Sequence, residues 1–76
     1  MSPRLPVISG EELIRVLRKF GYEIARQKGS HVRLRNESDP RRLPVTVPLH
    51  KELAPGTLKS VLSDANISLE ELIAAS

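Results

Sequence analysis

The sequence predicts a small α+β domain in which helices cover one face of a three-stranded antiparallel sheet. Three observations predict this fold. The chain has 76 residues, which is enough for one hydrophobic core. Apolar residues recur at helical spacing near both ends of the chain, and they alternate with polar residues between these segments. The predicted order is therefore α-β-β-β-α with a short extra helix at the C-terminus, in one domain spanning residues 1–76.

A capping box precedes the first predicted helix. Ser9 is followed three residues later by Glu12, and Gly21 comes just after the last apolar residue of the pattern. The sequence thus predicts a helix over residues 10–20, and residues 1–7, with two prolines and no periodicity, form an extended arm. The apolar face of the helix consists of Leu13, Ile14, Val16, Leu17 and Phe20.

From Tyr22 onward the pattern changes to the alternation of a strand. Regular alternation places Tyr22, Ile24 and Arg26 on one face of this strand. The residues on the other face are Glu23, Ala25 and Gln27. The segment Lys28-Gly29-Ser30 has turn composition, so a hairpin should lead into a second strand.

The second strand carries two kinds of side chain in strict alternation. If Val32 and Leu34 face the core, then His31, Arg33 and Arg35 project together from the opposite face. A polar loop follows over residues 36–42. A third strand over residues 43–47 turns Val45 and Val47 inward, and Pro44 places it at an edge of the sheet.

The C-terminal part of the chain predicts two helices after a connector over residues 48–52. Pro55-Gly56-Thr57 opens the first of them, and Asn66 ends it in the left-handed conformation. A second capping box, formed by Ser68 and Glu71, starts the short last helix. Both long helices should lie on the Val32 side of the sheet, which leaves His31 and the arginines facing solvent.

The composition narrows the possible functions. Twelve Lys and Arg residues against nine Asp and Glu residues give a net charge of +3, which favours a polyanionic partner such as nucleic acid. No cysteine is present, so disulfides and thiol catalysis are excluded, as expected in a reducing cytoplasm. No apolar run is long enough for a membrane span, and the N-terminus lacks the apolar stretch of a signal peptide. We therefore expect a cytoplasmic protein without a membrane partner.

His31 is the leading candidate for a catalytic residue. The sequence has no phosphate-binding glycine loop, no zinc-protease motif and no nucleophile elbow. An imidazole exchanges protons near neutral pH, and Arg26, Lys28, Arg33 and Arg35 would hold a phosphate beside it. The alternative is a solvated strand with an ordinary surface histidine. His50 lacks the Asp, Glu or Cys neighbours of a metal site, so no metal is expected.

Several motifs together resemble the HicA toxin family. They are Gly29-Ser30-His31, then Pro48-Leu49-His50, then Gly56-Thr57-Leu58, and the resemblance covers about residues 9–73. It implies a fold like the double-stranded-RNA-binding domain. It also implies an mRNA endonuclease of a type II toxin–antitoxin system, whose partner is a HicB-type antitoxin. We expect no cofactor. Where many members have glycine after the second helix, this chain has Asn66.

The resemblance also assigns roles to particular residues. The essential histidine of the family corresponds to His31, beside which Gly29 allows a close turn and Ser30 offers a hydroxyl. His50 corresponds to a second histidine with at most a supporting role. Two other functions stay open: a non-catalytic module that grips double-stranded RNA by its backbone, and an interaction protein whose sheet face is covered by a partner.

Overall fold

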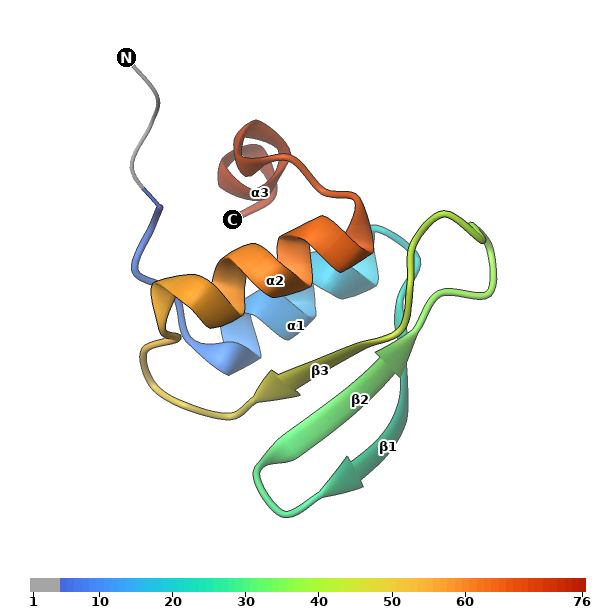
Figure 1. The fold of residues 1–76 in the computed structure, drawn as a ribbon, viewed down its shortest axis with the longest axis horizontal. Coiled ribbons are helices and arrows are strands. Elements are labelled where there is room, and N and C mark those ends of the chain that lie inside the picture. The colour runs from blue at the N-terminus through green and yellow to red at the C-terminus, as the bar shows by residue number, and fades with distance from the viewer. Residues whose placement is uncertain (1–4) are drawn as a thin grey trace.

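A computed structural model describes residues 5–76 and has the predicted element order. The three strands form one antiparallel sheet in the order β1-β2-β3, so β2 is the central strand (Figure 1). This is an α+β fold like that of the double-stranded-RNA-binding domain. The elements are α1 (Gly10–Lys19), β1 (Glu23–Lys28), β2 (His31–Arg35), β3 (Val45–Pro48), α2 (Pro55–Ala65) and α3 (Leu69–Ala75).

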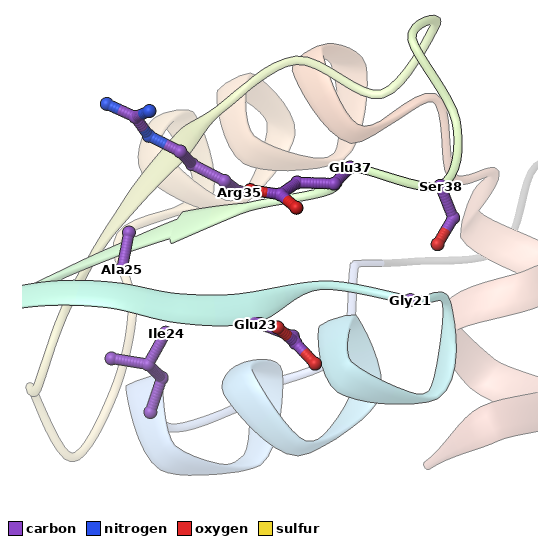
Figure 2. Close-up of a pocket in the computed structure, with 7 residues that line it drawn as sticks. All are labelled: Gly21, Glu23, Ile24, Ala25, Arg35, Glu37 and Ser38. Carbon is purple, nitrogen blue, oxygen red and sulfur yellow. The ribbon is translucent and has the colours of Figure 1, made fainter.

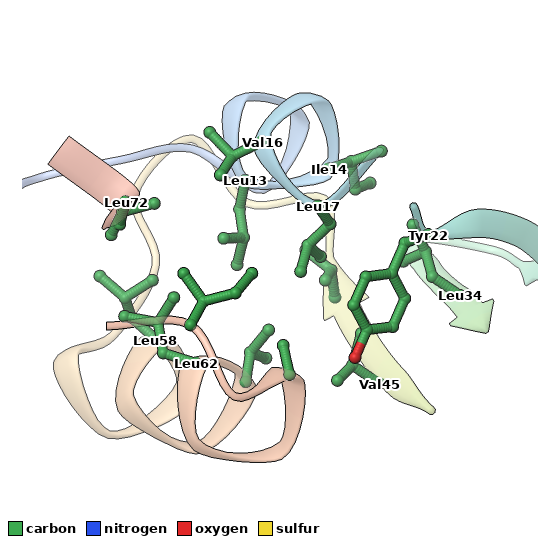
Figure 3. Close-up of a cluster of buried hydrophobic side chains, with 14 of the residues drawn as sticks. Leu13, Ile14, Val16, Leu17, Tyr22, Leu34, Val45, Leu58, Leu62 and Leu72 are labelled. Atoms are coloured by element: carbon green, nitrogen blue, oxygen red, sulfur yellow. The ribbon is translucent and has the colours of Figure 1, made fainter. Parts of the chain in front are cut away.

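The helices lie on one side of the sheet, and the core fills the space between them (Figures 1 and 3). Val32 and Leu34 of β2 are buried, as are Val45 and Val47 of β3. They pack with the apolar faces of the helices, to which α1 contributes Leu13 and other buried residues. The prediction that both long helices cover this face is confirmed. We call the opposite, solvent-facing side of the sheet the outer face.

The predicted helix ends are also found. Ser9 Oγ accepts a hydrogen bond from the Glu12 backbone N–H, at 3.1 Å. Gly21 has a φ of 94° after α1, and Asn66 has a φ of 56° after α2. In α3 both halves of the capping box with Ser68 are present. Side-chain caps and left-handed residues therefore set these helix boundaries.

Strand β1 is exposed along its whole length. Ile24 lies on the core side, because it pairs with the buried Leu34, but it is 49% exposed. The reason is the position of β1 at the edge of the sheet.

Of the predicted extended arm, residues 1–4 lie outside the described residues, and residues 5–7 have no regular secondary structure. The described part of the chain contains no helix with the length and apolar character that crossing a membrane requires.

Gly10 fixes the start of α1 against the end of β3. Its N–H donates to the His50 carbonyl oxygen at 2.9 Å, and a Cβ at this position would overlap the Pro48 carbonyl oxygen. The sequence alone does not reveal this contact, because Gly10 has the appearance of an ordinary first helical residue. The absence of a side chain thus lets helix and sheet approach each other.

Gly10→Ala should therefore lower the free energy of unfolding by about 1–3 kcal/mol, because backbone must move to admit the methyl group. Gly56→Ala is the matched control. No atom lies within 4 Å of the position that its Cβ would take, so it should gain about 0.4–1 kcal/mol. Urea denaturation of the three proteins measures both effects. Equal stability of the two variants would contradict the close approach.

Tyr22 ties the core to the loop before β3. Its side chain is buried, and its hydroxyl donates to the Leu43 carbonyl oxygen at 2.6 Å. Burial raises the pKa of the Tyr22 phenol above its ordinary value of 10.0, against a smaller opposing effect of the Arg42 guanidinium. The folded protein therefore holds this proton at a pH at which the unfolded chain has begun to release it.

Tyr22→Phe should cost about 1 kcal/mol at neutral pH, because the Leu43 carbonyl loses its partner. As the pH rises past 10, the wild-type protein should lose the part of its stability that depends on the protonated phenol. The variant lacks this part, so the difference between the two proteins should shrink. Urea denaturation of both proteins at pH 7 and above pH 10 measures this difference in the free energy of unfolding. A difference that grows with pH would contradict the proposed role of the protonated phenol.

Candidate functional site

A bulge in β1 decides which basic side chains reach the outer face. Ile24 pairs with Leu34, but the next pair joins Arg26 to Arg33, so Ala25 is an extra residue. Side chains of directly paired residues lie on the same face of a sheet. Regular alternation predicted Arg26 on the face of Ile24. That prediction is wrong, because the bulge moves Arg26 to the outer face beside Arg33.

The same pairing brings Lys28 opposite His31. Arg26 and Lys28 follow the bulge in the sequence. Because they are two residues apart on the same strand, they share the outer face. Together with the outward residues of β2 and β3 they surround a depression of about 240 Å³. We call this hollow the His31 depression. It is lined by Arg26, Lys28, His31, Arg33 and Thr46. The structure thus places four of the predicted site residues in one hollow.

Thr46 is a member of this site that the sequence analysis missed. It pairs with Arg33 across β2 and β3, and its hydroxyl oxygen accepts a hydrogen bond from Arg33 Nη1 at 3.1 Å. The bond holds the guanidinium on the outer face. The alternation of the strand could have revealed it, because Thr46 lies between Val45 and Val47, which were predicted to face inward.

In the part of the chain that the structure describes, no cation of the outer face forms an ion pair with a carboxylate. Within residues 5–76 the ion pairs are those of Asp39 with Arg41 and with Arg42, in the loop before β3. Arg26 and Arg33 face each other directly, and Lys28 stands opposite His31. Because like charges across a strand pair repel, this arrangement costs stability unless an anion binds between them.

The turn beside His31 contains two more of the predicted site residues, Gly29 and Ser30. Gly29 has a φ of 60°, which a two-residue hairpin requires and which glycine adopts without strain. The Ser30 carbonyl oxygen accepts from the Leu49 N–H at 2.7 Å, so the end of β3 supports the turn. His31 therefore starts its strand directly after a fixed turn, at the end of the outer face.

Two other predicted residues lie outside the His31 depression. Arg35 lines the neighbouring hollow of about 530 Å³, together with Arg26 and Arg33. His50 lines neither hollow, and its carbonyl oxygen is bound by Gly10 at the start of α1. A supporting role for His50 thus stays a prediction. Between residues 5 and 76, no three His, Asp or Glu side chains gather as the ligands of a metal would.

A further hollow, of about 260 Å³, lies at the other end of β1 and β2 (Figure 2). Glu37 and Ser38 lie on one side of it, and Gly21 and Glu23 on the other. Arg35 forms part of its lining as well as part of the previous hollow. The outer face is therefore basic at the His31 end and carries carboxylates at the end shown in Figure 2.

The fold and the site together define a small α+β domain of the double-stranded-RNA-binding type with an exposed, basic sheet face. A family model described as HicA toxin of bacterial toxin-antitoxin matches residues 10–67, which is most of the chain. The chain belongs to the HicA toxin family, and a toxin–antitoxin partner follows from that membership. No match was found among curated proteins.

The unpaired cations predict a stability gain on removing one of them. Arg26→Gln should raise the free energy of unfolding by about 0.2–1 kcal/mol at low ionic strength, because it removes the repulsion with Arg33. Added salt should reduce the gain, since it screens exposed charges. Lys59→Gln, on the exposed surface of α2, is the control for charge and should change stability less. Denaturation at low and high salt measures the effect, and a loss of stability in Arg26→Gln at low salt would contradict it.

Proposed function

We propose that this toxin is an endoribonuclease that cleaves mRNA in the cytoplasm and thereby blocks translation. The observation that carries the proposal is the placement of His31 in one hollow with three cations that have no carboxylate partner. An imidazole supplies proton transfer, and the cations supply binding and charge stabilisation for a phosphate. Family membership supports the same conclusion.

The reaction that fits these residues is attack of a ribose 2′-hydroxyl on the adjacent phosphate. The 2′-oxygen forms a bond to phosphorus, and the bond from phosphorus to the 5′-oxygen breaks. The products are a 2′,3′-cyclic phosphate and a free 5′-hydroxyl. His31 moves a proton as the 2′-hydroxyl attacks or as the 5′-oxygen leaves, and the need for the 2′-hydroxyl makes the reaction selective for RNA.

The basic side chains have distinct parts in this proposal. Lys28 faces His31 directly, so it holds the scissile phosphate and stabilises its added charge. Arg33 is fixed by Thr46 and faces Arg26, which makes this pair a clamp for a phosphate oxygen. Gly29 and Ser30 set the position of His31. These groups supply positive charge without a metal ion or cofactor, so we propose a metal-independent mechanism.

The inhibitor in this proposal is a HicB-type antitoxin that covers the outer face. Its carboxylates would neutralise the cations and prevent RNA from reaching His31. The proposal that RNA is only bound, and not cleaved, is the alternative outcome of the experiment below. A module that only grips the backbone needs lysine and arginine but has no use for a histidine among them.

His31→Gln should remove cleavage while RNA binding persists. Proton transfer contributes about 10²–10⁴-fold to such a reaction, so the single-turnover rate on a labelled RNA should fall by at least about 10²-fold. The assay contains EDTA, in which the wild-type protein should keep its activity. A strand with 2′-deoxyribose throughout should resist cleavage.

The controls separate catalysis from folding and charge. His50→Gln removes the other histidine and should cut RNA at a rate much closer to that of the wild type. Lys59→Gln removes a cation from the helix side and should leave both binding and cleavage unchanged. Undiminished cleavage by His31→Gln would refute the mechanism. Salt-sensitive binding without cleavage by the wild type would favour the alternative function.

A further inference from the structure

Three neighbouring hollows share lining residues along β2, and we call this row of hollows the trough. The His31 depression and the next hollow share Arg26 and Arg33, and that hollow shares Arg35 and Glu37 with the one in Figure 2. The trough therefore begins at the hairpin turn and ends where β2 leaves the sheet. A ligand that follows it passes His31 first and Arg35 later.

The side chains along this trough have a regular spacing. His31, Arg33 and Arg35 alternate with buried residues, so they stand two residues apart on β2. Two strand residues span about 6.7 Å, which is close to the separation of successive phosphates in an extended nucleotide strand. Each outward position of β2 can therefore meet one phosphate.

The charge of the trough changes along its length. Arg35 is the last cation, and Glu23 lies opposite it in the register of β1 and β2, without an ion pair between the two side chains. Glu37 follows two residues later and lines the same hollow. Carboxylates repel phosphates, so the row of phosphate contacts has to end at Arg35.

The row suits a single strand better than a duplex. It spans four residue steps, or about 13 Å, whereas a duplex-binding domain spans about 16 base pairs with contacts across two grooves. Neither aromatic side chain of the chain lies on the outer face: Tyr22 is buried and Phe20 packs on the core. Contact is therefore made with the backbone, without stacking of bases.

We propose that the substrate is a single RNA strand that lies along β2, with the scissile phosphate at His31. The next phosphate on one side binds at Arg33 and Arg26, and the one after it binds at Arg35. The carboxylates of Glu23 and Glu37 end the track. This inference rests on the proposed nuclease function and adds that the footprint extends to one side of the cleaved bond.

The test uses a 2′-O-methyl oligonucleotide with a single ribonucleotide, which fixes the bond that is cleaved. An uncharged methylphosphonate replaces the first or second phosphate on either side of that bond. On one side, each replacement should raise KM about threefold to fivefold, as expected for an exposed charge pair. On the other side, KM should stay unchanged. Equal sensitivity on both sides would overturn the proposed track.

A variant connects the effect to Arg35. Arg35→Gln should raise KM for the fully charged strand and should become insensitive to the methylphosphonate at the second position. It should remain sensitive at the first position, where Arg33 and Arg26 are intact. Arg15→Gln is the matched control, because Arg15 lies exposed on α1, on the other side of the sheet. Sensitivity of Arg35→Gln at the second position would overturn the assignment.

A binding experiment tests the track without requiring cleavage. Isotope-labelled His31→Gln protein is titrated with a fully 2′-O-methylated strand, and amide chemical shifts are followed by NMR. Shifts along residues 31–35 are expected, and shifts confined to the helices, or tighter binding of a duplex, would overturn the track. If wild-type protein leaves an all-ribonucleotide strand intact, the proposed nuclease function fails, whatever the NMR map shows.

Discussion

The burial of Val32 and Leu34 is the interaction on which the rest of the molecule depends. These two side chains pack under the helices, and alternation along β2 then forces His31, Arg33 and Arg35 to the opposite face. A shift of one residue in strand pairing would exchange the two sets and bury three basic side chains, at a high cost in desolvation. The hydrophobic core therefore fixes the position of the site, although none of its atoms belongs to the site.

The unpaired cations of the outer face lower the stability of the fold, and the proposed function accounts for their presence. Within residues 5–76, carboxylates pair with cations only in the loop around Asp39, where Arg42 also lies over the ring of Phe20. That loop lies beside α2, where Arg42 donates to the Ala65 carbonyl oxygen, and charge pairing there helps to hold the chain together. On the outer face, the same kinds of side chain stay unpaired, so their charge remains available to a phosphate. The fold thus keeps its stabilising ion pairs away from the cations that we propose bind RNA.

The sequence predicted most of the fold because local signals agree with one another. Capping residues, left-handed residues and alternation each indicated the same boundaries, and the parity of β2 alone predicted where His31 points. The failures have a common physical cause. The bulge at Ala25, the approach of Gly10 to Pro48 and the bond from Arg33 to Thr46 depend on segments that meet only in the folded chain. Local pattern cannot reveal contacts of that kind.

The bulge that turns Arg26 to the outer face also helps to protect β1, which is an exposed edge strand, from pairing with other chains. An unpaired edge strand offers free backbone groups to other chains, and natural proteins protect such edges with bulges, charges and short length. Strand β1 has six residues, a bulge before Arg26, and Lys28 at its end. The basic side chains proposed to hold RNA therefore also discourage strand pairing between copies of the protein. Replacing them with apolar residues would remove both properties at once, which gives the same positions two independent physical reasons to be basic.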